Sequence, residues 1–274
     1  MTKPSFDILL PYWGEFNLFK KTVDSVLAQT RDDWRLLIFD DCYPSSEAQN
    51  YCQSLNDPRV IYSRHKQNIG ITNNFNFAVN AAEADYCAIV GCDDILLPNY
   101  VEMALRNIGD TDFYQPGVEV IDGDDNAYLP LGDRIKRLLQ PRKPGVYSGE
   151  KLATSLCRGN WLYFPSIAWK TSSLKRYKFN DDYKIVEDVV VELDLIKDGG
   201  KLFFDKDHTT FQYRRFANSL SSREKSKGGV RFKEESNAYR HLSQVFSDKG
   251  WKKAARAARW HLTSRLHHLL SRLS

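Results

Sequence analysis

Three acidic pairs are the residues of this chain best suited to chemistry. They are Asp40-Asp41, Asp93-Asp94 and Glu187-Asp188. Neighbouring carboxylates repel each other unless a cation or a proton lies nearby, so a recurring pair indicates a site for a positive partner. Carboxylates also suit Mg²⁺ and Mn²⁺, which often bind together with phosphate groups.

Each pair also has a structural alternative. A single Asp-Asp is often a solvated turn or a helix N-cap. That alternative weakens for Asp40-Asp41 and Asp93-Asp94, because both pairs follow apolar runs that predict strands. Glu187-Asp188 precedes an apolar run of helical type, and acids stabilise a helix N-terminus. Its functional alternative is a carboxylate base at the rim of a site.

Strands and helices are predicted to alternate along the first 108 residues. Short apolar runs predict strands at 6–11, 34–39, 59–62 and 86–90, and helical spacing predicts helices at 16–29, 47–55, 72–83 and after 97–98. This alternation predicts an α/β fold with a Rossmann-like, mostly parallel sheet flanked by helices. Ligands bind such sheets at the carboxyl ends of the strands, which is where two acidic pairs are expected.

The pattern weakens after residue 110. We expect a turn at 122–126, a short basic helix at 133–140, a loop at 141–145, a helix at 186–196, a strand at 201–204 and a helical tail from about 230. Large aromatic side chains gather between 161 and 169. They predict either ordinary core packing or a platform that stacks on a sugar, and Trp161 is the candidate for the platform.

Several short motifs recur in a fixed order along residues 5–222. A strand ends at Pro11, a helix ends on Ser-x-x-x-Gln-Thr at 25–30, and a strand ends at the first acidic pair. Next come Asn68, Gly70 and Asn76, then the second acidic pair with Pro98, then the third pair, and last Tyr-Arg at 213–214 with serines at 218–221. In order and spacing the chain resembles the family 2 glycosyltransferases, which have the GT-A fold. No single motif is specific, but together they are.

The resemblance implies a role for each motif. Asp40 or Asp41 would bind the base of a nucleotide-diphosphate sugar, most simply a UDP- or dTDP-sugar. Asp188, with Glu187 beside it, would be the base that deprotonates an acceptor hydroxyl on a glycan or a lipid-linked sugar, with inversion. The implied ligands of Mn²⁺ or Mg²⁺ are Asp93 and Asp94, and the implied donor-binding residues are Pro11, Tyr12, Glu15, Asp40, Asp41, Asn68, Gly70, Asn76 and Asp93.

The chain departs from the family pattern in two places that concern charge. The family often has an acid two positions before Asp93, where this chain has Gly91. The family also has an arginine before its later asparagine, where this chain has Phe75. Arg64 or Arg214 is expected to supply the missing phosphate-facing cation.

Composition excludes several classes of protein. The chain has 274 residues, 42% apolar and 27% charged, which is ordinary for a globular protein. No stretch of 18 uncharged apolar residues occurs, and the first residues lack a signal-peptide core. The five cysteines are odd in number and lack metal-site spacing, so we expect reduced thiols in a cytoplasmic protein.

The charge is distributed unevenly. Residues 223–274 hold 13 basic and 4 acidic residues, whereas residues 1–222 hold 26 and 31. Within 249–273 an apolar helical stripe that includes Ala255, Ala258 and Leu262 runs beside basic residues. This pattern predicts either contact with an anionic membrane surface, at the inner face of the cell membrane, or packing on the protein's own body or on a second subunit.

The expected organisation is a nucleotide-sugar half at 1–110, an acceptor and catalytic-base half at 111–222, and a basic helical tail at 223–274. Two other functions remain as alternatives. A nucleotidyltransferase would need a glycine-rich basic loop after the first strand, and 11–15 has no such loop. A nucleic-acid-binding module is disfavoured because the basic residues occur in no nucleic-acid fold motif.

Overall fold

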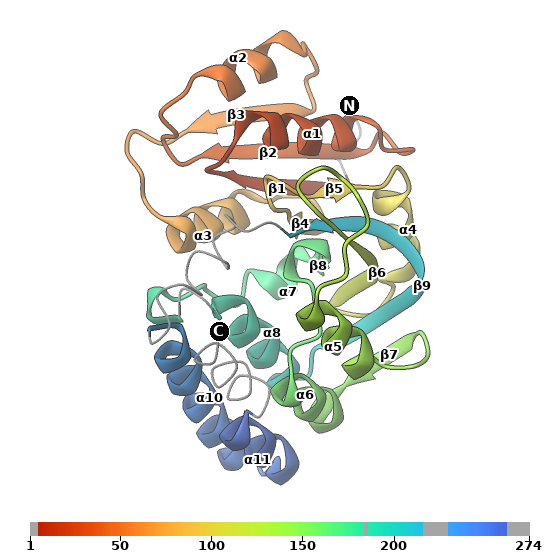
Figure 1. Ribbon diagram of the computed structural model, residues 1–274, viewed down its shortest axis with the longest axis vertical. Coiled ribbons are helices and arrows are strands. Elements are labelled where there is room, and N and C mark those ends of the chain that lie inside the picture. The colour runs from red at the N-terminus through yellow and green to blue at the C-terminus, as the bar shows by residue number, and fades with distance from the viewer. Residues whose placement is uncertain (1–4, 184–185, 216–229, 262–274) are drawn as a thin grey trace.

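A nine-stranded sheet runs through the molecule, and its first four strands are those that the sequence predicts. The computed structural model describes residues 5–183, 186–215 and 230–261. β1 (Phe6–Tyr12), β2 (Trp34–Asp40), β3 (Val60–Arg64) and β4 (Tyr86–Ile89) are parallel and lie in the order β3-β2-β1-β4 (Figure 1). The predicted α/β fold class, with a mostly parallel Rossmann-like half, is confirmed.

Alternate side chains of each strand pack on opposite faces of this half. Ile8 and Leu10 of β1 belong to the cluster on the side of α1 (Phe16–Leu27), α2 (Glu47–Ser54) and α4 (Tyr100–Asn107). Leu9 belongs to the cluster on the side of α3 (Ile71–Ala81). Because successive side chains of a strand point to opposite faces, a continuous apolar run is what a sheet covered on both faces requires.

The second half of the sheet is mixed, and the sequence predicted little of it. Beyond β4 lie β8 (Ala168–Lys170), β6 (Phe113–Ile121), β9 (Lys201–Arg214) and β5 (Ile95–Leu96), and β7 (Gly145–Ser148) pairs with β9. β6 contains Pro116 and Gly117, which usually interrupt a strand. Here Gly117 permits an irregularity in the pairing, because a Cβ would lie 2.9 Å from the backbone oxygen of Lys206.

The first 110 and the next 100 residues share this one sheet. β5 at Ile95–Leu96 pairs with β9, and β4 pairs with β8. The predicted boundary near residue 110 therefore falls in the connection between α4 and β6, and the strands on its two sides belong to one continuous sheet.

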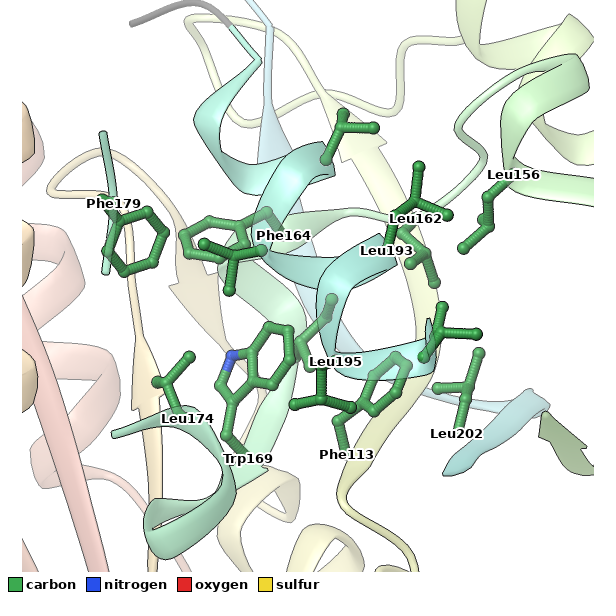
Figure 2. Packing of buried hydrophobic residues seen from close by; sticks show 14 of the residues in the cluster. Phe113, Leu156, Leu162, Phe164, Trp169, Leu174, Phe179, Leu193, Leu195 and Leu202 are labelled. Carbon is green, nitrogen blue, oxygen red and sulfur yellow. The ribbon is translucent and has the colours of Figure 1, made fainter. Parts of the chain in front are cut away.

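The helices of the second half surround α8 (Glu187–Lys197). They are α5 (Leu131–Leu139), α6 (Gly149–Arg158) and α7 (Thr171–Leu174), with short 3-10 turns η1 (Phe164–Ser166) and η2 (Asp181–Tyr183). Figure 2 shows Leu193 and Leu195 of α8 among buried side chains that include Trp169 and Phe113. Those two rings stack with centroids 5.2 Å apart. This packing fixes where the acidic N-terminus of α8 lies.

The predicted helical tail is present as α10 (Val230–Asp248) and α11 (Lys252–Trp260), which pack on each other and on α8 and α6. Ala254 and Ala258 of α11 are fully buried, and Ala255 packs against the same core. The described part of the apolar stripe therefore packs on the protein's own body, which is one of the two predicted alternatives. Its remainder, from Leu262, lies outside the described residues, as does the serine motif at 218–221. In the described part of the chain, none of the helices has the length and apolar character needed to cross a bilayer.

Candidate active site

The carboxyl ends of β2, β1 and β4 are neighbours in the sheet, and each leads into residues that the sequence singled out. Tyr12 at the end of β1 pairs in register with Asp40 at the end of β2. Asp93 and Asp94 follow the end of β4 on the other side of β1. The prediction that two acidic pairs share one edge of the sheet is confirmed by this strand order.

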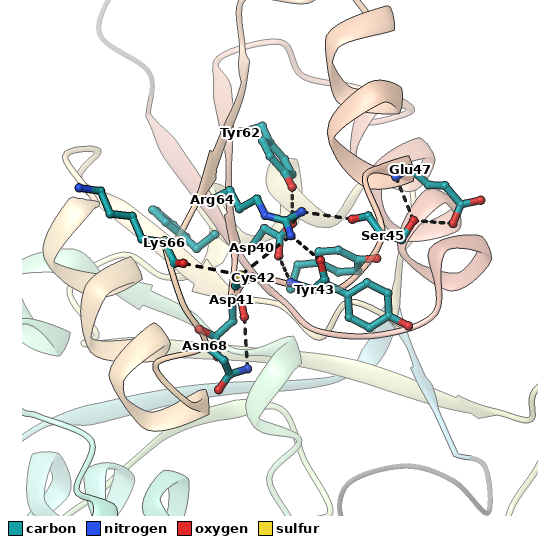
Figure 3. Close-up of polar contacts among 12 residues, drawn as sticks. Asp40, Asp41, Cys42, Tyr43, Ser45, Glu47, Tyr62, Arg64, Lys66 and Asn68 are labelled. Carbon is teal, nitrogen blue, oxygen red and sulfur yellow. Dashed lines mark hydrogen bonds and ion pairs between the residues drawn. The ribbon is translucent and has the colours of Figure 1, made fainter.

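Asp40 is fully buried, and its carboxylate already has partners (Figure 3). It accepts hydrogen bonds from the backbone N–H of Tyr43 at 2.7 Å and from the hydroxyl of Tyr62. The Arg64 guanidinium lies 3.4 Å away and also donates to the backbone oxygens of Tyr43 and Ser45. Asp40 therefore organises the loop after β2, and Arg64 is committed to that loop rather than to a phosphate.

Asp41 fixes the turn that precedes α3. Its carboxylate accepts the backbone N–H groups of Ile69 at 2.6 Å and Gly70 at 3.0 Å, and Asn68 donates to its backbone oxygen at 3.2 Å. Gly70 has a φ of 83°, a conformation that favours glycine. Asp41, Asn68 and Gly70, three of the predicted donor-binding residues, thus meet at one turn. Two backbone hydrogen bonds to the Asp41 carboxylate hold this turn in place.

The remaining predicted donor-binding residues lie around the same edge. Pro11 is half-buried, and Tyr12 is buried with its hydroxyl donating to Gly14 at 3.0 Å. Glu15 is exposed at the start of α1. Asn76 exchanges hydrogen bonds of 2.9 and 3.0 Å with the backbone of Phe179. The amide of Asn76 therefore ties α3 to the segment that leads to α8.

Sequence reasoning missed one aromatic side chain at this edge. Trp13 follows β1, is 45% exposed, and meets the ring of Tyr43 edge-on with centroids 5.2 Å apart. Large exposed aromatic rings beside a buried carboxylate are suited to holding a flat heterocycle. The signal in the sequence was the Pro-Tyr-Trp run at the end of the first strand.

The second acidic pair converges on a glycine. A Cβ at Gly91 would lie 2.6 Å from Oδ2 of Asp94 and 3.0 Å from Oδ1 of Asp93, so both carboxylates lie over the bare glycine backbone. Burial raises the pKa of Asp93, and it raises that of Asp94 well above its usual range, with the charge of Asp93 adding to the effect on Asp94. Two adjacent carboxyls whose pKa values are raised by burial fit a divalent cation.

Arg214 holds this acidic turn in place. Its side chain is fully buried, its backbone N–H donates to Oδ1 of Asp94 at 2.9 Å, and its Nε donates to the backbone oxygen of Asp93 at 2.7 Å. Its guanidinium also reaches the 122–126 turn, with an ion pair of 2.6 Å to Asp125. The expectation that Arg214 is a phosphate-facing cation is therefore corrected, because its donors are used within the protein.

The third acidic pair begins α8, where burial separates its two members. Glu187 is buried, which raises its pKa to about 8, with the charge of Asp188 contributing after burial. Asp188 is only partly buried and lies in the first turn of the helix. One turn further on, Glu192 is fully buried, and burial raises its pKa well above the usual range, again with a contribution from Asp188.

Glu192 was not predicted from the sequence, although it lies four residues after Asp188 and thus on the same face of α8. Asn160 donates to one of its oxygens at 3.1 Å, and the other has no hydrogen-bond partner. Burial raises the pKa of Glu187 to about 8 and that of Glu192 well above its usual range, so burial favours the protonated form of both side chains. Asp188 is therefore the member of this acidic group that is placed to accept a proton.

Two cations, Lys136 of α5 and Arg215 directly after β9, face the same region. Lys136 lies 4.4 Å above the ring of Tyr163 and donates to a backbone oxygen at 2.5 Å. Burial lowers its pKa to about 8, the charge of Arg215 lowers it further, and the carboxylates of Asp133, Asp188 and Glu192 oppose the shift. Arg215 itself bonds to Asp133 through two nitrogens at 3.2 Å. These residues connect the region of Asp188 with the second acidic pair.

The predicted sugar platform at 161–169 is wrong. Trp161 is fully buried, its Nε1 donates to Ser155 at 3.1 Å, and its ring lies 5.0 Å from that of Phe204. Trp169 is equally buried. The large rings form the core under α8, which is the alternative that the sequence also allowed.

Comparison with known proteins places this arrangement in a family. Residues 7–171 match the family described as Glycosyl transferase family 2, which is more than half of the chain. The chain belongs to glycosyl transferase family 2. The predicted resemblance is confirmed, and the matched segment contains the ends of β1, β2 and β4.

Relatives within the family resemble parts of this chain. A protein of Escherichia coli (strain K12) named as a colanic acid biosynthesis glycosyl transferase, WcaA, is 34% identical over 105 residues, 38% of each chain. An uncharacterized glycosyltransferase of Methanocaldococcus jannaschii is 26% identical over 66% of this chain and 61% of its own length. The similarity thus spans about two fifths and three fifths of the lengths of these two relatives.

Solved structures share the fold at low sequence identity. TarS of Staphylococcus aureus in complex with UDP-GlcNAc gives a TM-score of 0.67 at 14% identity, covering 89% of this chain and 71% of that chain. The mannosyltransferase PcManGT of Pyrobaculum calidifontis, in complex with GDP-Man and Mn²⁺, gives 0.64 at 13% identity, covering 99% and 74%. The fold of the chain is therefore of the GT-A type.

Proposed function

We propose that this chain transfers a sugar from a nucleoside-diphosphate donor to a hydroxyl of a glycan or lipid-linked acceptor, with inversion at the anomeric carbon. The observation that supports this most directly is the convergence of Asp93 and Asp94 over Gly91 at the carboxyl edge of the sheet. Family membership and a relative named for colanic acid biosynthesis favour a surface polysaccharide as the product.

The nucleotide is proposed to lie along the ends of β1 and β2. Asp40 and the turn held by Asp41 provide polar groups for the base and ribose, and Trp13 provides an exposed aromatic face. A uridine or thymidine donor is proposed, in keeping with the UDP-GlcNAc bound by TarS. Pro11, Tyr12, Glu15, Asn68 and Gly70 are the neighbouring candidates for contact, whereas Asn76 positions α3.

A divalent cation, Mn²⁺ or Mg²⁺, fits the second acidic pair. Asp93 and Asp94 would hold it, and bound there it would neutralise charge on the diphosphate leaving group. Within the described residues no cluster of three or more His, Cys, Asp or Glu side chains could form a closed metal site. Two carboxylates together with substrate phosphates are a usual environment for Mg²⁺.

Asp188 is proposed as the base of the reaction. Its carboxylate takes the proton of the acceptor hydroxyl while that oxygen forms a bond to the anomeric carbon. The bond from this carbon to the diphosphate breaks on the opposite side, and the diphosphate leaves with the electron pair. Burial raises the pKa of both Glu187 and Glu192, which limits the negative charge that would repel the leaving group.

The test compares two variants of the same helix. Asp188→Asn keeps the shape of the side chain and removes the proton acceptor, so sugar transfer should slow by about 10²–10⁴. Asp194→Asn is the control, because Asp194 pairs with Lys197 at 3.0 Å away from this group. The assay measures release of nucleoside diphosphate, which separates this reaction from nucleotidyl transfer. Full activity in the Asp188 variant would refute the assignment of the base.

A further inference from the structure

The outer face of α11 carries a group of cations and one tryptophan that the proposed sugar transfer does not use. We call Lys252, Lys253, Arg256, Arg259 and Trp260 the basic face of α11. At 3.6 residues per turn they fall within an arc of about 120°. All five are exposed, whereas Ala254 and Ala258 on the opposite side are fully buried. The helix is therefore anchored by small residues and presents its charge outward.

The cations of this face have no acidic partners. Within 5–183, 186–215 and 230–261, none of the four pairs with a carboxylate. Glu150 is the nearest acid shown by hydrogen bonding, and it accepts the backbone N–H of Lys253 at 2.6 Å, as a cap on the helix. The four positive charges therefore have no compensation in the described part of the chain, and they favour an anionic partner.

The face is also hollowed. Lys253, Arg256, Ala257 and Trp260 of α11, together with Arg158 at the end of α6, line a depression of about 410 Å³. Trp260 is 56% exposed at this depression, where its ring is an apolar surface among three cations. Tryptophan with lysine and arginine around it is a composition typical of contacts at a membrane–water interface, where the indole lies at the level of the headgroups.

We propose that the basic face of α11 binds the phosphate-bearing headgroups of an anionic bilayer. The cations are spread along a helix of nine residues, roughly 13 Å, which matches a surface carrying many phosphates better than a single small anion. The residues beyond 261 add Arg265 and Arg272 and no acid, so the sequence continues the positive charge. Figure 1 shows α11 at the end of the molecule away from α2, so the ends of β1 and β2 would stay accessible.

This proposal keeps the predicted contact with an anionic membrane surface and assigns it to one face of α11. The described members of the apolar stripe, Ala255 and Ala258, pack on the core and are not available for that contact. Contact through the opposite, charged face would be electrostatic and superficial. Such binding weakens with salt because the screening length is about 8 Å at physiological ionic strength.

The experiment measures partitioning of the full chain onto vesicles of phosphatidylcholine, with and without phosphatidylglycerol. Wild type should bind only the anionic vesicles and should dissociate at high salt. Lys253→Gln/Arg256→Gln should partition about 30-fold less, because each cation near an anionic surface contributes roughly a fivefold factor. Arg142→Gln/Lys143→Gln removes the same charge from an exposed loop and should bind like wild type.

Two further measurements keep the proposal open to refutation. Trp260→Ala should reduce binding to the anionic vesicles at low salt, since it removes the contact of the indole with the headgroups while leaving the four cations in place. Nucleotide binding should be the same in all these variants, so failure here is separable from failure of the proposed transfer. Equal loss in the Arg142/Lys143 control would overturn the proposal, as would unchanged vesicle binding in the Lys253/Arg256 variant.

Discussion

The acidic pairs after β2 and after β4 have the same residue types and flank the same strand, yet their surroundings differ. Asp40 and Asp41 each accept several donors, mostly backbone N–H groups, so their charge is used to build loops. Asp93 and Asp94 lie together over Gly91, and their pKa values are raised. The first pair therefore shapes the loops on which the proposed nucleotide site is built. At the second pair Asp94 accepts a hydrogen bond from the backbone N–H of Arg214, yet both pKa values remain raised, which indicates room for a cation.

The largest effect that would separate the two pairs concerns metal. Asp93→Asn should weaken Mn²⁺-dependent binding of nucleoside diphosphate by about 100-fold, because loss of even an outer partner of a metal site costs roughly 10–100-fold. Calorimetric titration with and without chelator measures this. Asp110→Asn, at an exposed position, is the control. If wild type binds the nucleotide equally well without metal, the proposed metal-binding role of Asp93 and Asp94 is wrong.

The next effect concerns stability. Asp41→Ala removes the acceptor of the Ile69 and Gly70 N–H groups, so the free energy of unfolding should fall by about 2–4 kcal/mol. Urea denaturation measures it. Asp93→Asn should leave the stability unchanged or raise it, since it relieves repulsion on the buried carboxyl of Asp94. A stability loss in Asp93→Asn as large as that in Asp41→Ala would show that both pairs are structural.

The smallest effect concerns pH, and it extends the comparison to α8. Burial raises the pKa of Glu187 to about 8, above its value in the unfolded chain. Its favourable contribution is complete below about pH 4.5 and is lost as the pH rises through 8. Between pH 5 and 8, wild type should lose about 1–3 kcal/mol more stability than Glu187→Gln.

Denaturation across this pH range measures the difference between wild type and Glu187→Gln. Glu47→Gln, at an exposed position, should follow wild type throughout. Parallel profiles for wild type and Glu187→Gln would mean that Glu187 is ionised in the folded protein. Asp188 would then not be the only charged carboxylate at the start of α8, and the assignment of the base would need revision.

The sequence by itself determined the parallel half of the molecule. Val, Ile and Leu side chains buried on both faces make continuous runs, and each predicted strand from 6 to 90 is present. The same pattern predicted that two acidic pairs lie at the carboxyl edge of the sheet, because locating a strand in the sequence also locates its carboxyl end. The acids at the start of α8 were also visible, since they precede a helical apolar run.

Only the tertiary structure decided the mixed half of the sheet and the surroundings of the site residues. The reason is that the burial and the partners of a side chain depend on segments that are distant in the sequence. β6 continues through Pro116 and Gly117, where its pairing with β9 is irregular. From local sequence alone, these two residues predict that the strand ends. Glu192 looks like any exposed helical acid until Asn160 and Lys136 are placed against it. Arg214 and Trp161 are likewise interior residues because segments distant in the sequence contact them, the 122–123 turn for Arg214 and Phe204 for Trp161. The positive charge of α11 is evident from the sequence. Which side of that helix faces outward depends on the packing of Ala254 and Ala258, which only the tertiary structure shows.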